Sequence, residues 1–266
     1  AEKASKVSNK KKQQSIRPDR LSSSKQKDTV QKSMQKSAKS MESRLSQLQE
    51  VRTETKEQEI HFPTPKSVEI HNKYPIRGEN LQLTAGDKIL LKQTDFQFAL
   101  NKKIAIVGEN GSGKTTLLDA IVNDREGVVL SPKVAFSFYQ QMDYKLYVEE
   151  SMLTFLMKRT VYPEKLVRSL LNNLGFAQLE INKPLSALSG GEATKLAIAL
   201  LFVRPSNVLI LDEPTNFIDI KTIEALEKLI ASYEGTVIFT SHDPYFVEKL
   251  ADEVYEMKNK QLQLMS

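Results

Sequence analysis

The residues of this chain with the clearest chemistry lie in a glycine-rich loop at 108–116, which reads GENGSGKTT. In the pattern G-x-x-x-x-G-K-T, backbone N–H groups and the start of the following helix surround phosphates. Lys114 is placed to reach the β and γ phosphates, and the Thr115 hydroxyl to ligate Mg²⁺. The loop therefore predicts a nucleoside triphosphate site, with the candidate ligands Gly108, Glu109, Asn110, Gly111, Ser112, Gly113, Lys114, Thr115 and Thr116.

Two adjacent acidic residues and one histidine follow apolar runs further along the chain. Asp212 and Glu213 end the run VLIL at 208–211, where neighbouring side chains project differently and can divide two roles. Asp212 suits the magnesium shell, and Glu213 suits polarising the water that attacks the γ phosphate. His242 ends the β-rich run TVIFTSH and is placed to contact the same phosphate. The other two histidines stand in no such pattern, so no role is assigned to them.

Short apolar runs and amphipathic stretches predict the elements that hold these residues. KIAIV at 103–107 and the runs before Asp212 and His242 are typical of buried strands, and an apolar helix follows the loop. The stretch 150–179 lacks strand-like alternation and carries leucines at helical spacing, so a helical subdomain is expected at about 148–203. The remaining pattern predicts helices at 189–202, 221–233 and 244–251 and terminal strands at 254–264. The chain thus predicts an α/β fold with a helical insert.

The sequence LSGGE at 188–192 opens one of these helices, between the phosphate loop and the acidic strand. A glycine pair at a helix start supplies a second phosphate-facing surface. In this order the three motifs resemble those of the ATP-binding cassette ATPases, and the resemblance covers the chain from about Lys73 to its C-terminus. It implies a P-loop core sheet with a helical subdomain, ATP and Mg²⁺ as cofactors, and ATP hydrolysis between two cassettes.

The same resemblance implies roles that residue chemistry alone does not. Gln140, with Gln141 as the fallback, matches the glutamine that contacts Mg²⁺ and the attacking water. Asp219 matches the aspartate that links the two sites across a cassette dimer. Ala85 stands where the family usually places an aromatic ring on adenine, and Tyr74 is a weak candidate to replace it. The residues that match the signature, which caps the γ phosphate bound by the opposing cassette, are Ser189, Gly190, Gly191 and Glu192.

Positive charge is concentrated at the start of the chain. Residues 1–50 carry 13 Lys or Arg and 5 Asp or Glu, a net charge of +8, whereas the whole chain is +5. A stretch this rich in charge and without aromatic residues is unable to build a core of its own. Its apolar residues recur at intervals of three and four, which predicts one seam of a coiled-coil hairpin. We therefore expect a basic helical hairpin linker at 1–60, with its first helix truncated and its tip at about 14–23, and a nucleotide-binding domain at 61–266.

A cassette with the wording DEPTN behind a charged hairpin resembles the ABC-F family, whose members carry two cassettes joined by a helical linker that enters the ribosome. The linker and the cassette entry EIHNKYPI are similar to the Msr-type macrolide-resistance branch of that family, although Phe217 and Ile218 depart from the usual HL. The resemblance implies a second cassette and ribosomal RNA as partners, no membrane, and a macrolide antibiotic as an indirect partner. It places the tip residues Arg20 and Leu21 near the ribosome's drug site. The chain alone is then expected to bind ATP and hydrolyse it poorly.

Composition narrows the class of protein further. The chain has no cysteine, which excludes disulfides and thiolate metal sites, and it shows no signal peptide or long apolar span, so a soluble cytoplasmic protein is expected. Three alternatives share the cassette motifs: a general ABC-F translation factor, the ATPase subunit of a transporter, and a module whose cassette is only a scaffold. The basic stretch favours a polyanion partner over a solvated spacer, and a transporter subunit has no use for a basic hairpin. The intact Lys114, Asp212, Glu213 and His242 argue against the scaffold.

Overall fold

The structure is a computed structural model of the 266-residue chain, and it describes residues 60–139, 149–216 and 218–265. The predicted linker at 1–60, with its tip residues Arg20 and Leu21, lies outside the described residues apart from Ile60. Gln140 and its fallback Gln141 also lie outside them. The cassette core, including the phosphate loop, the acidic strand end and the signature, is described.

A six-stranded sheet lies at the centre of the described part of the chain. Its strands are β3 Lys103–Val107, β5 Phe136–Tyr139, β6 Val208–Leu211, β7 Thr236–Thr240, β8 Glu253–Lys258 and β9 Gln261–Leu264. They follow the order β5-β6-β7-β3-β8-β9, in which all neighbours are parallel except the antiparallel pair β8 and β9. The strands predicted before the phosphate loop, before Asp212 and before His242 are therefore confirmed, as are the terminal strands.

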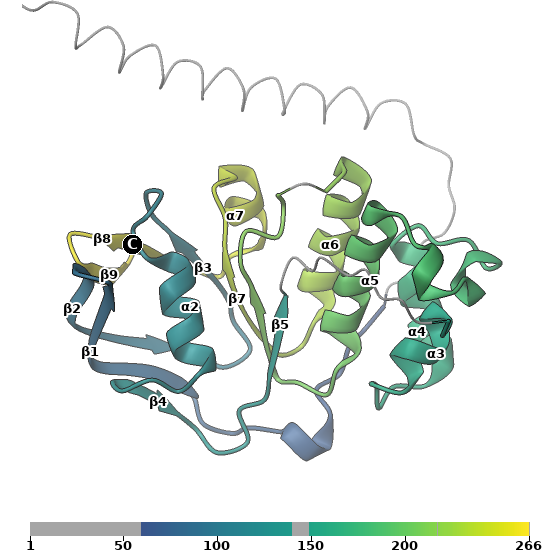
Figure 1. Ribbon diagram of the computed structural model, residues 1–266. Helices are drawn as coiled ribbons and strands as arrows, with labels where there is room; N and C mark the ends of the chain where they lie inside the picture. The colour runs from purple at the N-terminus through teal and green to yellow at the C-terminus, as the bar shows by residue number, and fades with distance from the viewer. Residues whose placement is uncertain (1–59, 140–148, 217, 266) are drawn as a thin grey trace, which may run out of the picture. The chain divides into compact units, whose positions relative to one another are not determined.

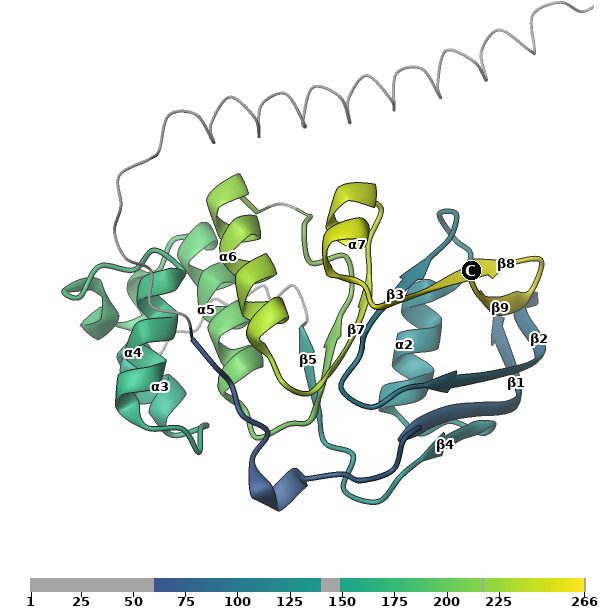
Figure 2. The same ribbon diagram turned by 180° about the vertical axis from the view of Figure 1, so that it is seen from behind.

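Helices cover both faces of this sheet, which explains why its central strands are apolar throughout. They are α2 Lys114–Val122, α5 Gly190–Val203, α6 Ile220–Ser232 and α7 Pro244–Leu250. Because successive residues of a strand point to opposite faces, Ile104 and Ile210 pack with the apolar residues of α2, whereas Ala105 and Leu209 pack with those of α5, α6 and α7. Figure 1 and the reverse view in Figure 2 show α2 on one side of the sheet and α5 and α6 on the other.

A second, three-stranded antiparallel sheet is not predicted by the sequence. It consists of β1 Ile76–Ala85, β2 Lys88–Phe98 and β4 Val128–Leu130 in the order β2-β1-β4, and its apolar residues share a core with α2. The pairing of β1 with β2 shifts register several times between Gly78 and Thr84. These shifts interrupt the period-two alternation by which a half-buried strand is recognised. A tight turn at Gly86, with φ of +57°, joins the two strands beside the phosphate loop.

Residues 150–188 form short helices rather than strands, as the missing alternation predicts. They are α3 Met152–Met157, α4 Glu164–Asn173 and the 3-10 turns η2 Glu180–Asn182 and η3 Leu185–Ala187. Ser151 caps α3 by accepting a hydrogen bond from the Thr154 N–H at 3.2 Å, and Pro163 immediately precedes α4. Within the described ranges, no helix has the length and apolar character needed to cross a membrane.

Candidate nucleotide-binding site

The phosphate loop joins the end of β3 to the start of α2, and at two of its positions the backbone accepts only glycine without strain. Gly108 has φ of +153°, and a Cβ there would lie 2.8 Å from the Met257 carbonyl oxygen. Gly113 precedes α2 with φ of +108°, and its Cβ would lie 2.8 Å from Leu90 Cδ1. A side chain at either position would both strain the backbone and clash, so the loop conformation depends on glycine.

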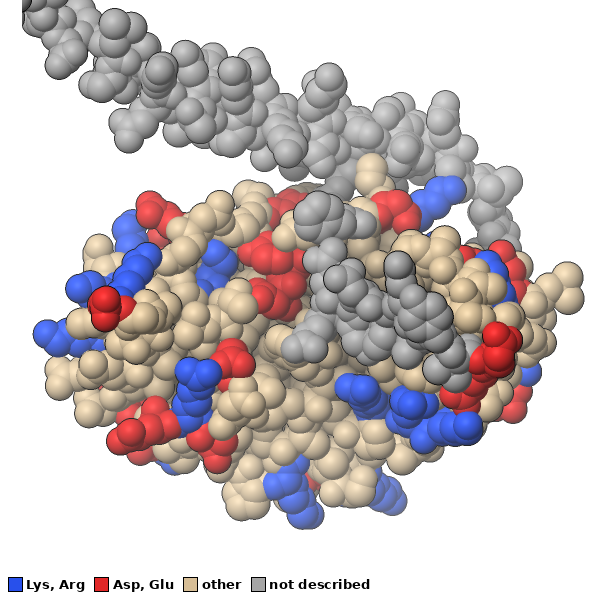
Figure 3. Space-filling view, viewed as in Figure 1, with Lys and Arg blue, Asp and Glu red and all other residues tan. Residues whose placement is uncertain are grey.

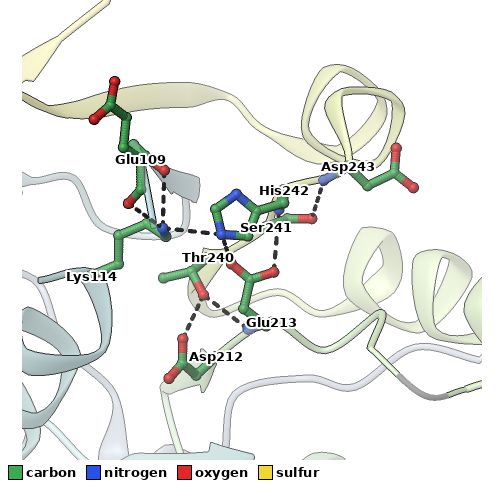
Figure 4. A network of polar contacts seen from close by, with 9 residues as sticks. Glu109, Lys114, Asp212, Glu213, Thr240, Ser241, His242 and Asp243 are labelled. Atoms are coloured by element: carbon green, nitrogen blue, oxygen red, sulfur yellow. Dashed lines mark hydrogen bonds and ion pairs between the residues drawn. The ribbon is translucent and has the colours of Figure 1, made fainter. Parts of the chain in front are cut away.

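Lys114 lies buried at the mouth of this loop, with 7% of its surface exposed. Its Nζ donates hydrogen bonds to the Gly108 carbonyl at 3.0 Å and the Glu109 carbonyl at 3.2 Å, and it lies 3.3 Å from His242 Nε2. Glu109 takes part through its main chain, since its carboxylate points away from the network in Figure 4. The ammonium group is thus held where the loop and the end of β7 meet.

Asp212 and Glu213 follow β6 and are joined by a residue that the sequence analysis did not single out. The Thr240 hydroxyl, at the end of the neighbouring strand β7, donates to Asp212 Oδ1 at 2.6 Å and accepts the Glu213 N–H at 2.9 Å. Glu213 has φ of +46°, a left-handed conformation that is uncommon outside glycine. The two carboxylates therefore project differently, as predicted, and Thr240 holds the Asp212 carboxylate and the Glu213 main chain (Figure 4).

Glu213 and His242 meet across the ends of β6 and β7. The His242 backbone N–H donates to Glu213 Oε2 at 3.2 Å, and His242 Nε2 lies 3.2 Å from Glu213 Oε1. Glu213 Oε1 is buried and has no hydrogen-bond partner among the described residues, so the approach to Nε2 lacks hydrogen-bond geometry. Nε2 can accept a hydrogen bond from the Lys114 ammonium only while it carries no proton of its own. The histidine nitrogen therefore lies between the lysine and the carboxylate, within 3.3 Å of each.

Two adjoining hollows open beside these residues. One, of about 510 Å³, is lined by Thr115, Asp119, Phe138, Tyr139, Asp212, Glu213 and Asn216. The other, of about 560 Å³, follows the phosphate loop and is lined by Ala85, Lys88, Leu90, Asn110, Gly111, Gly113, Lys114, Thr115, Thr116, Glu213, Asn216 and His242. Thr115 and Glu213 line both hollows, so the predicted magnesium ligand and the predicted water-polarising group lie where the hollows meet. Burial raises the pKa of the Tyr139 hydroxyl, which keeps it a neutral hydrogen-bond donor at this wall.

The donor set of these hollows fits a magnesium nucleotide. Carboxylate and hydroxyl oxygens, here from Asp212 and Thr115, are the ligands that Mg²⁺ prefers. Backbone N–H groups at the start of α2 and the Lys114 ammonium suit phosphate oxygens. The buried Ser112 Oγ and Glu213 Oε1 have no hydrogen-bond partner within the described ranges, and buried polar atoms of this kind are rare in folded proteins.

The wall of the second hollow formed by β1 and β2 carries no aromatic side chain. Ala85 lies there, as its alignment with the missing adenine-stacking ring predicts, and Tyr74 is not among the lining residues. Lys88, which the sequence analysis missed, donates from Nζ to the Gly111 carbonyl at 2.8 Å and so ties β2 to the phosphate loop. Its position two residues after the β1–β2 turn becomes meaningful only once the strands are paired.

The signature residues lie at the start of α5 and are not among the residues that line the two hollows. Ser189 is the N-cap of α5, and its backbone N–H and hydroxyl each donate to Glu192 Oε2 at 2.7 Å. Lys183 donates to both carboxylate oxygens of Glu192 at 2.9 and 3.1 Å. The hydrogen bonds from Ser189, followed by the Lys183 charge, lower the pKa of Glu192 from 4.5 to about 2. Glu192 therefore serves the helix cap, while Gly190 and Gly191 remain exposed beside it.

Asp219, the predicted link between two cassettes, caps α6. Its Oδ1 accepts the Thr222 N–H at 3.0 Å, and its Oδ2 accepts the Thr222 hydroxyl at 2.7 Å. Burial favours the neutral acid, but the bonds from Thr222 and the charge of Lys195 outweigh it and lower the pKa of Asp219. The carboxylate is thus oriented by its own helix, and within this chain it does not line the nucleotide hollows.

Comparison with known proteins identifies this arrangement. The family model described as ABC transporter matches residues 91–216. The chain is 47% identical to the erythromycin resistance ATP-binding protein MsrA of Staphylococcus epidermidis over 95% of the chain and 52% of that protein. It is 31% identical to ABC transporter F family member 2 of Arabidopsis thaliana over 84% of the chain and 34% of that protein. The chain belongs to the ABC-F family of ATP-binding cassette proteins. It contains an ABC ATPase domain, for which ATP is the nucleotide.

One further relative and one solved structure are also similar to the chain. The ribosome protection protein VmlR of Bacillus subtilis (strain 168) is 34% identical over 68% of the chain and 34% of that protein. The solved structure named RNase-L Inhibitor matches with a TM-score of 0.59 at 23% identity, over 77% of this chain and 41% of that one, which supports the cassette fold alone. The chain spans about half the length of MsrA and about a third of the length of VmlR and of ABC transporter F family member 2.

Proposed function

We propose that this chain is half of an ABC-F protein that binds the ribosome and protects it from macrolide antibiotics, driven by binding and hydrolysis of MgATP. The observation that carries the proposal is the 47% identity, over 95% of the chain, to a protein named for erythromycin resistance. The likeness to a relative named as a ribosome protection protein supports the same target. The meeting of Lys114, Asp212, Glu213 and His242 at one edge of the sheet supports the chemistry.

In the proposed reaction the water oxygen attacks the γ phosphorus while the bond from that phosphorus to the ADP oxygen breaks. Glu213 orients the water through Oε1, which accepts no hydrogen bond from the described residues, and it takes the proton that the water loses. Lys114 turns its ammonium from the loop carbonyls to the β and γ phosphates and stabilises the charge on the leaving oxygen. His242 contacts the γ phosphate beside Lys114. Thr115 and Asp212, with Gln140 by resemblance, would hold a Mg²⁺ ion, which neutralises phosphate charge.

A second cassette completes the proposed site. Gly190 and Gly191 are exposed, and a Cβ at either would meet nothing within 4 Å. An exposed helix start with open space in front of it suits the phosphate of a nucleotide held by another cassette. Because Ser189, Gly190 and Gly191 lie outside the hollows of their own chain, a single cassette would hydrolyse ATP slowly. Asp219, fixed by Thr222, would then contact the partner cassette.

Binding to ribosomal RNA would come mainly from the basic start of the chain. Residues 1–50 have a net charge of +8, which leaves 25 basic and 28 acidic residues in 51–266. Basic and acidic side chains are interspersed over the cassette face shown in Figure 3. Contacts between Lys or Arg and RNA phosphates release counterions, so affinity falls steeply with salt. In this proposal Arg20 contacts rRNA and Leu21 lies near the drug site, so the macrolide is affected without binding the cassette.

The test compares ribosome co-sedimentation of the full-length protein with its Glu213→Gln variant in MgATP. Because glutamine is isosteric but unable to take the proton, the variant should remain ATP-bound and ribosome-bound, whereas the parent is released after hydrolysis. Lys114→Met is the matched control, since it should bind ribosomes without dependence on ATP. If Glu213→Gln leaves ribosomes as fast as the parent, the proposal that ATP hydrolysis releases the protein from the ribosome is wrong.

Macrolide susceptibility of cells that express the full-length protein tests the resistance part of the proposal. The parent should raise the inhibitory concentration of erythromycin, and Glu213→Gln should not. Ribosome binding without any change in susceptibility would favour a general ABC-F translation factor instead. Co-purification with membranes and not with ribosomes would favour a transporter subunit.

A further inference from the structure

One hydroxyl group, that of Thr240, contacts both the Asp212 carboxylate and the main chain of Glu213. Thr240 is the last residue of β7 and is fully buried. Its Oγ1 donates to Asp212 Oδ1 at 2.6 Å and accepts the Glu213 N–H at 2.9 Å. Both the hydroxyl proton and one of its lone pairs are thereby used in fixed directions.

These two bonds hold the Asp212 carboxylate directly and the Glu213 carboxylate only through its main chain. With Oδ1 of Asp212 held by Thr240, the other carboxylate oxygen points away from the threonine in Figure 4 and is left for a cation. The Glu213 backbone, at φ of +46°, is in a conformation that persists only where its surroundings hold it. Two hydrogen bonds help to hold the Glu213 backbone in this conformation. The Thr240 hydroxyl accepts the Glu213 N–H, and the Asn216 N–H donates to the Glu213 carbonyl at 3.1 Å.

We propose that Thr240 is a positioning residue that aligns Asp212 for Mg²⁺ and Glu213 for the attacking water. The inference rests on the proposed ATP hydrolysis and adds a residue to it. In this role Thr240 acts on Asp212 through its carboxylate and on Glu213 through its main chain. Partners that orient a metal ligand from outside the coordination shell commonly change metal affinity or activity about 10- to 100-fold when removed.

The same strand provides a matched control for a merely structural role. Thr236, at the opposite end of β7, is also fully buried, and its Oγ1 accepts the Asn101 N–H at 2.9 Å. Thr236→Val and Thr240→Val remove the same atom from the same strand and leave a backbone N–H without its hydroxyl partner. Only the second change removes a contact to Asp212 and Glu213, so a difference between the two variants separates positioning from strand stability.

The experiment uses the parent chain and its Thr240→Val, Thr240→Ser and Thr236→Val variants, each checked for folding by circular dichroism. Calorimetry with ATP, in Mg²⁺ and in EDTA, measures how much the metal strengthens binding, a readout that requires no turnover. Steady-state hydrolysis measures kcat and KM separately. Thr240→Val should reduce both the metal-dependent gain in affinity and kcat about tenfold or more, with little change in the EDTA affinity. Thr240→Ser should recover both within about threefold, and Thr236→Val should match the parent.

Two results would overturn the inference. One is a folded Thr240→Val variant with the parent's metal-dependent gain and the parent's kcat. The other is an equal loss in Thr236→Val, which would assign the effect to the strand as a whole. Failure of the proposed function has a different signature, because it appears in the parent itself as absent ATP binding or absent hydrolysis.

Discussion

The charge of Glu192 should stabilise the start of the signature helix measurably. Its carboxylate accepts two hydrogen bonds from Ser189 and two from Lys183. In Glu192→Gln one oxygen becomes an NH₂ group, which turns a donor toward the Lys183 ammonium or the Ser189 N–H. The substitution therefore keeps the size of the side chain while it removes the charge and sets donor against donor.

The size of the effect follows from the lowered pKa of Glu192. The difference between 4.5 and about 2, at about 1.36 kcal/mol for each pH unit, corresponds to about 3 kcal/mol. With 21% of the side chain exposed, solvent screening reduces this, and we expect about 1–2 kcal/mol. A carboxyl whose pKa is depressed on folding contributes this stability above its unfolded pKa of 4.5 and loses it as the pH falls toward about 2.

Urea unfolding followed by circular dichroism measures the free energy of unfolding of parent and variant. The difference should be constant between about pH 7 and pH 5 and should shrink to less than half near pH 3. Glu164→Gln is the matched control, because Glu164 pairs with Arg168 on an exposed helix face and should change stability by less than about 0.5 kcal/mol. A Glu192→Gln variant as stable as the parent near pH 7, or a difference that does not shrink in acid, would refute the reasoning.

Three further substitutions have defined outcomes by chemical denaturation. Gly113→Ala should lower the free energy of unfolding by about 1–3 kcal/mol and weaken ATP binding in calorimetry, because of its φ of +108° and the clash with Leu90. Gly190→Ala, where a Cβ meets nothing within 4 Å, should be neutral or stabilise by up to about 1 kcal/mol, and a large loss would contradict the open helix start. Lys249→Met should cost about 3 kcal/mol, because it leaves Glu227, only 3% exposed, without the ammonium 2.7 Å away; unchanged stability would contradict a contribution from this ion pair.

Local motifs explain why the phosphate loop and the strand ends were predictable. Gly108 and Gly113 adopt positive φ values that other residues rarely adopt, so the glycines themselves indicate the loop conformation. The apolar runs before Asp212 and His242 indicate strands that are buried on both faces. Parallel strands end at the same edge of a sheet, so residues that follow β6 and β7 meet without further information.

Other parts of the site depend on contacts that no local pattern contains. Thr240 and Asp212 are 28 positions apart, and Lys88 and Gly111 are 23 apart. A buried threonine in a β-rich run resembles any other strand residue, and Thr236 on the same strand has no link to the carboxylates. The antiparallel sheet that carries Lys88 escaped prediction because its register shifts disrupt the alternation.

The sequence by itself determined the kind of chemistry, since nine consecutive residues specify a phosphate loop and two more motifs specify the acidic pair and the signature. The tertiary structure decided how these residues act on one another. It placed the Thr240 hydroxyl between the Asp212 carboxylate and the Glu213 N–H, His242 between Lys114 and Glu213, and the signature outside the hollows of its own chain. The physical reason is that residue type and spacing determine backbone conformation over a few residues, whereas the direction of a buried hydrogen bond depends on strand register and packing across the whole domain.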